Sequence, residues 1–434
     1  MKFLQKYFQL DQNHTNIKTE ALAGFTIFLT MLYIIPVGSQ ILSEAGMPKN
    51  ELITVISLVT ALATLLTGLW ANTPVAMSVG MGLVAYFTYG LVQGMGLSWQ
   101  QGLGAVFLSG VIFIIISFTR IRVWIMQSIP KDLRFALCAG LGAFIATIGF
   151  KSLGFITITS SGLMTLGNIS SPHILIGIFG VIVMLLLHTL KIQGAFIIGI
   201  LLCSAISWIL GYSSLPSEIF SSPSSISSIA MKFDLVGIMN VALIPAIIAL
   251  LITDLFDSLG TLAGVGAKAK MFQDVSGKDK KLEKTLQADA IATTAGAMFG
   301  VSTTTAFLES SAGVAVGGRT GLTAIFTAVL FGLTLFLLPI FSAIPDYAIY
   351  PTLIVVGALM FAEIRHIDFS DLPICVASFF TIILMPLSSS ITTGLASGFI
   401  VYVLMCAFKK QWKRINPGVI ILFVISLIPF IFQN

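Results

Sequence analysis

The chain has 434 residues, of which 56% are hydrophobic and only 9% are charged, and its mean hydropathy is +1.00. Soluble domains carry roughly 25% charged residues, so this composition excludes a soluble enzyme or binding module and indicates a polytopic membrane protein. The net charge of +5 does not indicate nucleic-acid binding, because the Lys and Arg residues lie between apolar segments instead of on one soluble face. We therefore expect no nucleic-acid partner.

The N-terminal segment 1–19 is mixed and polar, without the apolar stretch and small-residue cleavage site of a signal peptide. We interpret it as a short cytoplasmic tail with an amphipathic start. Beyond it, apolar runs long enough to cross about 30 Å of hydrocarbon as helices recur from Ala21 to Phe432. They predict fourteen spans and a final apolar stretch, 417–432, of open topology: 20–43, 51–71, 79–93, 98–118, 133–151, 172–190, 192–212, 237–263, 285–300, 307–317, 320–343, 347–361, 372–388 and 391–408.

The distribution of basic residues supports this count. With the N-terminus in the cytoplasm, all 23 Lys and Arg residues except Lys49, Lys151 and Lys232 fall on the cytoplasmic side. This is the positive-inside bias of membrane proteins, which a missed or invented span would scramble. We expect a multi-pass protein of the cell membrane, in a bacterium the inner membrane, with a cytoplasmic N-terminus.

Two of the predicted spans have poor helix-forming sequences. The segment 71–90 contains Pro74, Gly80 and Gly82, and the segment 300–321 opens with a β-prone Ser-Thr-Thr-Thr run. Each is the third span of a seven-span half, and because seven is odd the two halves have opposite orientations in the membrane. Matched broken segments in inverted halves point to a transport site near the midplane. The alternative, that Gly and Ala only let helices pack closely, stays open.

This organisation divides the chain into five parts. The tail 1–19 is followed by a first seven-span repeat, 20–212, an external linker, 213–236, and a second repeat, 237–408. A basic segment with an apolar end, 409–434, completes the chain.

Few acids fall within the predicted spans. Asp254 and Asp257 lie in 237–263, Glu309 begins the helical part of 307–317, and Asp289 and Glu20 lie closer to membrane edges. A charge near the bilayer centre costs about 2.5–3.5 kcal/mol, so such residues usually face a cavity and serve function. At a spacing of three, Asp254 and Asp257 share one helix face. In the alternative, one Asp supports a broken helix and only the other meets substrate, with Asp257 and Glu309 the stronger candidates.

These acids favour a transporter over an enzyme. A buried carboxyl group beside another can take up and release a proton during a transport cycle, which suits a proton-coupled symporter of a neutral, donor-rich solute. The chain has no nucleotide-binding GxxxxGK[ST] loop, and its four His residues form no HExxH pair. Its four cysteines are scattered singly without metal-ligand spacing. We expect no enzyme activity, no metal and no cofactor.

Four stretches carry a resemblance to a known family. They are TEALAGFTIFLTMLYIIP, GMGLVAYFTYG, DLFDSLGTLAGVGAKA and TTTAFLESSAGVAVGGRTGLTAI, and together they resemble the AzgA-like purine permeases, a branch of the nucleobase/ascorbate transporter superfamily. The match runs in order from about residue 17 to 410. It implies a proton symporter of adenine, guanine or hypoxanthine that works by alternating access. It also implies an all-α fold of two inverted seven-span repeats, with short strands in spans 3 and 10 that cross near the substrate.

The resemblance further implies a core and a gate. The core would comprise the spans in 20–118 and 237–343, and the gate those in 133–212 and 347–408. The family's acids fall on Asp254, Asp257 and Glu309, which would serve substrate binding and proton coupling. Val84 and Val79 stand where family members typically have Asn and Pro. Because Val can neither donate nor accept a side-chain hydrogen bond, the choice of substrate is left open.

We hypothesise that a planar base stacks on Phe307 or Phe87 while the carboxylates accept its N–H donors. Ser310, next to Glu309, is a further candidate contact. A related carrier for a pyrimidine, urate or an inorganic anion is the alternative, although buried acids would repel an anion. An ion channel or membrane enzyme would need a pore ring, metal cluster or nucleophile triad that the sequence lacks. The expected partners are the purine, protons and the lipid bilayer, and a homodimer is left open.

Overall fold

The computed structural model describes residues 2–119, 129–159, 164–216, 218–240, 243–269, 271 and 280–431. Arg120, Arg122, Lys270 and Lys278, which the sequence places in cytoplasmic loops, lie outside them. Helices dominate this part of the chain, as predicted, and nine of its helical segments are long and apolar enough to cross a membrane: Ile17–Ser43, Lys49–Ala71, Trp99–Ser117, Lys131–Ser152, Pro172–Thr189, Ile244–Gly266, Gly321–Ser342, Asp346–His366 and Ile391–Phe408. The count of fourteen spans stays a prediction.

The first half of the chain alternates long helices with two irregular stretches. Its elements are α1 (Lys2–Phe8), α2 (Ile17–Met31), α3 (Ile34–Ser43), α4 (Lys49–Leu66), the π-helix η1 (Thr67–Ala71), β1 (Met77–Val79), α5 (Met81–Ala85), the π-helix η2 (Tyr86–Gly94), α6 (Trp99–Ser117), α8 (Lys131–Ser152), β2 (Ile156–Ile158), β3 (Met164–Leu166), α9 (Pro172–Thr189) and α10 (Ala195–Ile209). Local signals set several starts. Asn16 caps α2 by accepting from Thr19 N, and Ser98 and Gln101 form a capping box at α6.

The second half follows a similar pattern. Its elements are α11 (Ile244–Ala269), α12 (Lys280–Phe299), β4 (Thr304–Ala306), α13 (Ser310–Val316), α14 (Gly321–Leu333), η4 (Thr334–Leu337), α15 (Leu338–Ser342), α16 (Asp346–Phe361), η5 (Ala362–His366), α17 (Leu372–Ser388), α18 (Ile391–Phe408), η6 (Trp412–Arg414) and α19 (Pro417–Ile431). The predicted spans 372–388 and 391–408 coincide with α17 and α18.

The two strands predicted in spans 3 and 10 are present and pair with each other. β1 and β4 are antiparallel, with Ser78 opposite Thr305. Beyond the strands, Gly80 N donates to Thr303 O and Phe307 N to Ala76 O, each at 3.0 Å. Non-helical backbone inside a membrane protein must satisfy its hydrogen bonds within the protein, and this pairing does so for both broken spans at once.

Two features differ from the sequence-based expectation. The first predicted span is broken between α2 and α3, at Leu32 and Tyr33. A hairpin of β2 and β3, which the sequence did not predict, joins α8 to α9. Asp289, which the sequence placed closer to a membrane edge, is fully buried within the protein, and its depth in the membrane stays a prediction. It lies inside α12, because this helix begins at Lys280, five residues before the predicted span.

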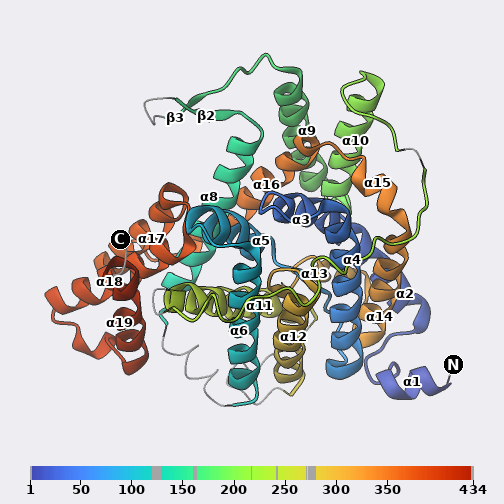
Figure 1. Ribbon diagram of the computed structural model, residues 1–434. Helices are drawn as coiled ribbons and strands as arrows, with labels where there is room; N and C mark the ends of the chain where they lie inside the picture. Colours follow the sequence, from blue (N-terminus) through green and yellow to red (C-terminus); the bar gives the residue numbers. More distant parts are fainter. Residues whose placement is uncertain are drawn as a thin grey trace.

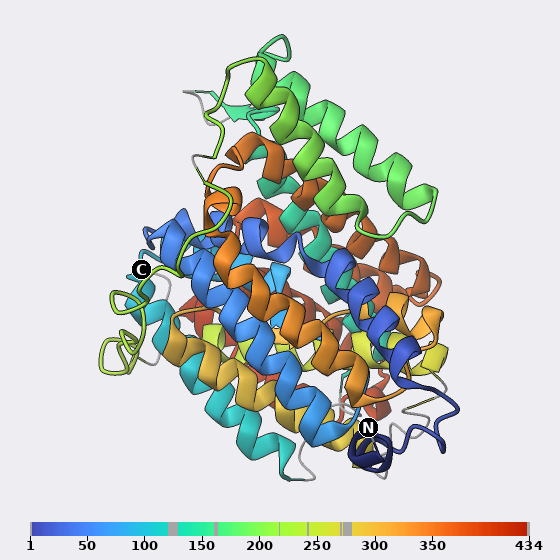
Figure 2. The same cartoon turned by 90° about the vertical axis from the view of Figure 1, so that its right-hand side faces the viewer.

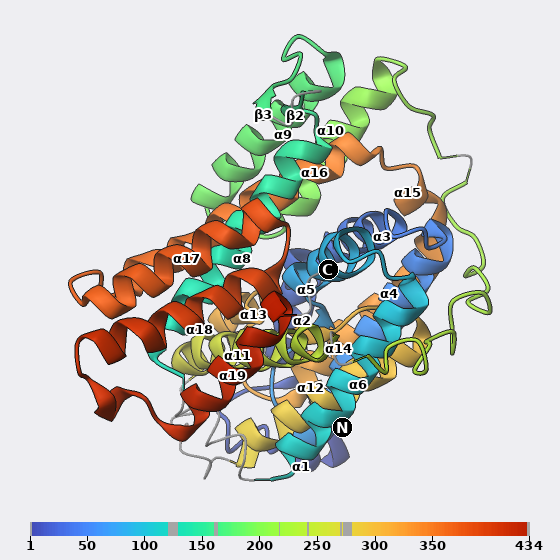
Figure 3. The ribbon, with the colours of Figure 1, turned by 60° about the vertical axis from the view of Figure 1, so that its left-hand side comes forward.

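The helices pack in two groups, which Figure 1 and Figure 3 show from two sides. The outer group consists of α8, α9, α10, α16, α17 and α18. The strand-bearing group consists of α2 to α6 and α11 to α15 with β1 and β4, and Figure 2 shows α4, α6, α12 and α14 running side by side within it. α11 lies where the groups meet, since it contacts α8 and α18 as well as α6, α13 and β4. A ligand bound on α11 would therefore be held between the two groups.

Candidate functional site

Hydroxyl groups fix the paired strands in the middle of the strand-bearing group. Ala76 N donates to Ser310 Oγ at 3.0 Å, so the hydroxyl of Ser310 satisfies the backbone just before β1. On α4, Thr64 Oγ1 donates to Met77 O at 3.0 Å and accepts from Met77 N at 3.1 Å. Ser310, a predicted substrate contact, is thus engaged in holding β1 and is fully buried.

Glu309 lies half-buried at the first turn of α13, where β4 has just ended. The Tyr33 hydroxyl donates to Glu309 Oε1 at 2.7 Å. Tyr33 comes from the break between α2 and α3, and its ring packs on Phe196 of α10, with centroids 4.9 Å apart. Sequence reasoning missed Tyr33. The signal that could have found it is Pro36, because a proline within a helix disturbs the carbonyl four residues before it, here Leu32, where the helix breaks.

Asp257 lies half-buried on α11, facing the outer group. It accepts from Thr305 Oγ1 at 3.4 Å and is within electrostatic range of Glu309. Cys138 of α8 is within electrostatic range of the same carboxylate. One turn further along α11, a Cβ on Gly260 would meet no heavy atom within 4 Å. Asp257 and Glu309 are thus both partly accessible, and α11 is unpacked at Gly260, one turn beyond Asp257.

Asp254 points elsewhere, although the sequence places it one turn from Asp257. It is 1% exposed and accepts from Thr293 Oγ1 of α12 at 3.2 Å. Asp289 of α12 is also fully buried and accepts from Ser258 of α11. The structure thus brings Asp254 together with Asp289 between α11 and α12. It leaves Asp257 near Glu309 instead.

The other predicted site residues are covered. Phe307, at the end of β4, is 7% exposed, and Val84 in α5 is fully buried. Phe87 is fully buried against α6, so closely that a Cβ on Gly102 would lie 2.7 Å from its ring. Phe87 therefore presents no open ring face in this structure.

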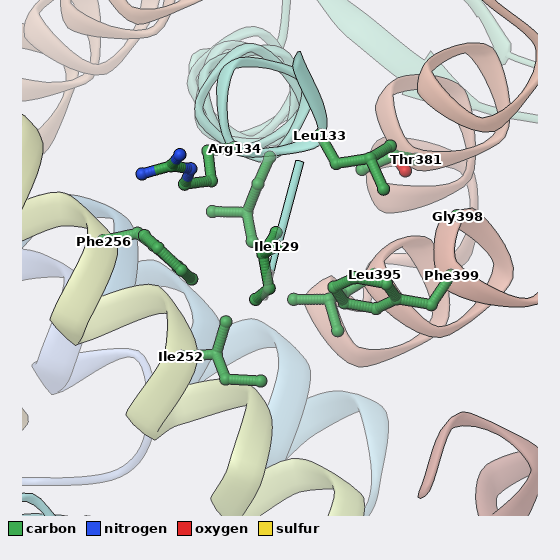
Figure 4. Close-up of a pocket in the computed structure, with 10 residues that line it drawn as sticks. Ile129, Leu133, Arg134, Ile252, Phe256, Thr381, Leu395, Gly398 and Phe399 are labelled. Carbon is green, nitrogen blue, oxygen red and sulfur yellow. The ribbon is translucent and has the colours of Figure 1, made fainter. Parts of the chain in front are cut away.

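A narrow cleft, whose volume of about 10 Å³ holds no more than one water molecule, lies between α11 and the outer group (Figure 4). Arg134 is the charged side chain of its lining, and its guanidinium carbon lies 5.5 Å from the ring centroid of Phe256. That geometry is a cation–π contact between α8 and α11. None of the seven predicted site residues lines this cleft, which is bordered by Ile129, Leu133, Arg134, Leu137, Ile252, Phe256, Thr381, Leu395, Gly398 and Phe399.

Comparison with known proteins identifies the family. A family model with the description "Permease family" matches residues 18–397. The chain belongs to this permease family. The permease is accordingly a transporter and not an enzyme.

Relatives resemble the permease over nearly their whole length. It is 44% identical to a protein of Methanocaldococcus jannaschii named as a permease, covering 100% of this chain and 99% of the relative. It is 38% identical to adenine permease AdeP of Escherichia coli, over 99% of this chain and 96% of the relative. It is 37% identical to guanine/hypoxanthine permease PbuO of Bacillus subtilis, over 97% and 99%.

Solved structures share the fold at low identity. The transmembrane domain of the cyanobacterial bicarbonate transporter BicA matches with a TM-score of 0.62 at 13% identity, covering 95% of this chain and 97% of that one. SLC26A9 matches with a TM-score of 0.63 at 15% identity, covering 91% of this chain and 66% of that one. At these identities the likeness concerns the fold alone.

Proposed function

We propose that the permease takes up purine nucleobases together with protons across the cell membrane, with its N-terminus in the cytoplasm. The observation that carries this proposal is the pair of half-buried carboxylates next to the paired strands: Asp257 accepts from Thr305 of β4, and Glu309 follows the end of β4 by three residues. The names of the relatives, which include adenine and guanine/hypoxanthine permeases, support a purine as the substrate.

The chemistry of the two acids suits a purine base. Guanine and hypoxanthine carry an N1–H that can donate to an ionised carboxylate, and guanine adds a 2-amino group. Adenine offers its 6-amino group beside an acceptor N1, which pairs better with a protonated carboxyl group. The protonation state of Asp257 and Glu309 would then select between these bases, and Phe307 would offer a stacking surface once it is uncovered.

Transport would proceed by alternating access between the two helix groups. In this proposal the strand-bearing group is the core, from 20–118 and 237–343, and the outer group is the gate, from 133–212 and 347–408. The position of α11 between the groups supports this division, because a base bound at Asp257 would face either side as the groups move.

The test is uptake of radiolabelled adenine, guanine and hypoxanthine by permease-deficient cells at two external pH values. Asp257→Asn and Glu309→Gln should abolish or strongly reduce uptake, and acidic medium should accelerate uptake by the unmodified protein. Undiminished uptake by both variants would refute the site. Competition by uracil or urate, but by no purine, would favour a carrier of another solute.

A glycine pair provides a matched control for the site. Gly260→Leu should block uptake by filling the space beside Asp257. Gly332→Leu, on α14, also places a side chain where no heavy atom lies within 4 Å, but away from the acids. Both substitutions remove a helical Gly, which favours the helix by roughly 0.8 kcal/mol, so both proteins should fold. Equal uptake by the two variants would contradict the proposed binding position.

A further inference from the structure

Behind the paired strands, α11 and α12 exchange hydrogen bonds through a crossed set of four side chains. Asp254 and Ser258 are four residues apart on α11, and Asp289 and Thr293 are four residues apart on α12, so each pair shares a helix face. Ser258 donates to Asp289 Oδ2, and the single hydroxyl proton of Thr293 is shared between Asp254 Oδ2 at 3.2 Å and Thr304 O at 2.9 Å. Each helix thus supplies the hydroxyl for the other helix's acid.

The two carboxylates of this crossed set lack a counter-charge. Both are at most 1% exposed, and no ion pair among the described residues includes either. Asp254 Oδ1 and Asp289 Oδ1 have no hydrogen-bond partner in the part of the chain that the structure describes. An unpaired ionised carboxylate is costly to bury, and two close together repel each other. A proton on one of them would remove both penalties.

Among the described residues, the side chains around these two carboxylates include other acids but no cation. Within electrostatic range of Asp289 are Asp254 and Asp257, both on α11. β4 presents the hydroxyls of Thr304 and Thr305, and α6, packed on α12, carries no charged residue. The charges of α4, Lys49 and Glu51, lie at its first turn, where they contact Asp346 and Ser228.

A chain of hydroxyls connects Asp289 to Asp257. Ser258 contacts Asp289 Oδ2, Ser258 Oγ lies 2.8 Å from Thr305 Oγ1, and Thr305 Oγ1 lies 3.4 Å from Asp257 Oδ2. Each of these three contacts needs one proton, and the two hydroxyl groups supply only two. When all three are made, the third proton is on a carboxyl group at one end of the chain.

We propose that Asp289 is a proton-binding residue of the permease and exchanges its proton with Asp257 through Ser258 and Thr305. With the proton on Asp289, each hydroxyl points toward Asp257. Transfer moves the Asp289 proton to Ser258 Oγ, the Ser258 proton to Thr305 Oγ1 and the Thr305 proton to Asp257 Oδ2. Both hydroxyl groups are neutral after the transfer, and one proton has moved from Asp289 to Asp257.

This inference rests on the proposed function, since it assigns the path of the coupled proton. The substrate-facing acid would receive its proton from a buried partner and not directly from water. Purine binding at Asp257 and protonation at Asp289 would then be linked through the residues of β4.

The test uses the full-length protein in proteoliposomes and compares two kinds of transport. Purine uptake driven by an inward proton gradient requires net proton movement, whereas exchange of internal for external purine does not. Asp289→Asn should retain exchange but lose the acceleration by the gradient. Thr305→Val, which keeps the shape of the side chain and removes its hydroxyl, should slow gradient-driven uptake by roughly tenfold or more while exchange continues.

Thr294→Val is the matched control, because the hydroxyl of Thr294 donates only within α12, to Ala290 O. It should leave both kinds of transport unchanged. If Asp289→Asn shows no exchange, Thr305→Val decides. Gradient-driven uptake that persists in Thr305→Val and in folded Asp289→Asn would overturn the inference while leaving proton symport intact. Absence of gradient-driven uptake in the unmodified protein would instead overturn the proposed symport and the inference together.

Discussion

The hydroxyl of Tyr350 ties the outer group to the strand-bearing group, so Tyr350→Phe should allow the two groups to separate more often. Glu44, at the end of α3, accepts from Tyr350 of α16 at 3.1 Å and from Tyr89 of η2 at 2.8 Å. Lys49 and Asp346 form an ion pair across the same junction at 2.9 Å, but both are partly exposed and such pairs contribute little. The Tyr350 bond is therefore one polar tie that a single substitution removes, beside the buried contact of Tyr86 in η2 with Thr392 in α18.

The magnitude follows from the chemistry of this bond. A hydrogen bond to a charged group contributes about 1.5–3 kcal/mol. Tyr350 is half-exposed and its bond is longer than that of Tyr89, so the lower value applies. A loss of about 1.5 kcal/mol raises the population with separated groups roughly tenfold.

Thiol labelling measures this population. The reporter is Gln40→Cys, since the Gln40 side chain lies 3.4 Å from the Tyr350 hydroxyl and is buried at the junction. Cys138, Cys203, Cys375 and Cys406 would be replaced by Ser, which leaves the introduced thiol as the single target. A membrane-impermeant maleimide should then label that thiol roughly tenfold faster when Tyr350→Phe is added than in the parent.

Tyr347→Phe is the control for this experiment. Tyr347 lies on the same helix, but its hydroxyl contacts Ser207 of α10, within the outer group. Its loss removes a hydrogen bond without releasing the junction. Equal labelling rates in the two variants would refute the reasoning that the Glu44 contact holds the groups together.

Three further predictions concern single residues. Tyr33→Phe removes the donor to Glu309, so the KM for purine measured in uptake kinetics should rise roughly tenfold. The melting temperature should change little. An unchanged KM would show that Tyr33 does not act at the site. Glu20→Ala leaves the backbone N–H groups of Arg319, Thr320 and Thr323 without their acceptor at the start of α14, and should lower the free energy of unfolding by about 3 kcal/mol, seen as a lower melting temperature in detergent. Glu20→Gln, which keeps an acceptor, should lose less. Val84→Asn places an amide at a fully buried position and should lower the free energy of unfolding by about 1–3 kcal/mol. If position 84 lies near the substrate, added purine should stabilise this variant more than it stabilises the parent.

The sequence was sufficient to predict the class of fold and its irregular segments. Hydropathy marks helices through length and composition alone, so α17 and α18 match their predicted spans to the residue. Pro, Gly and β-branched residues marked the segments 71–90 and 300–321 as poor helices, whereas the two short strands were implied by the family resemblance. The inverted relation of the halves was predicted from the seven spans expected in each half, and that span count stays a prediction.

The partners of each acid could not be read from the sequence. Asp254 and Asp257 have nearly the same local sequence environment, yet one faces α12 and the other faces the outer group. The two side chains are only about 60° apart around α11, so the difference arises from where α12 and β4 pack against that face. This difference is not visible without the positions of both neighbours.

What the sequence by itself determined is which segments are apolar, where helices break and which few charges lie within the membrane, because each of these depends on nearby residues only. Tertiary structure decided which of those charges meet. Tyr33 reaches Glu309 across 276 positions, and Ser258 reaches Asp289 and Thr305 across 31 and 47. Such contacts depend on the packing of whole helices, which sets distances that no local pattern encodes.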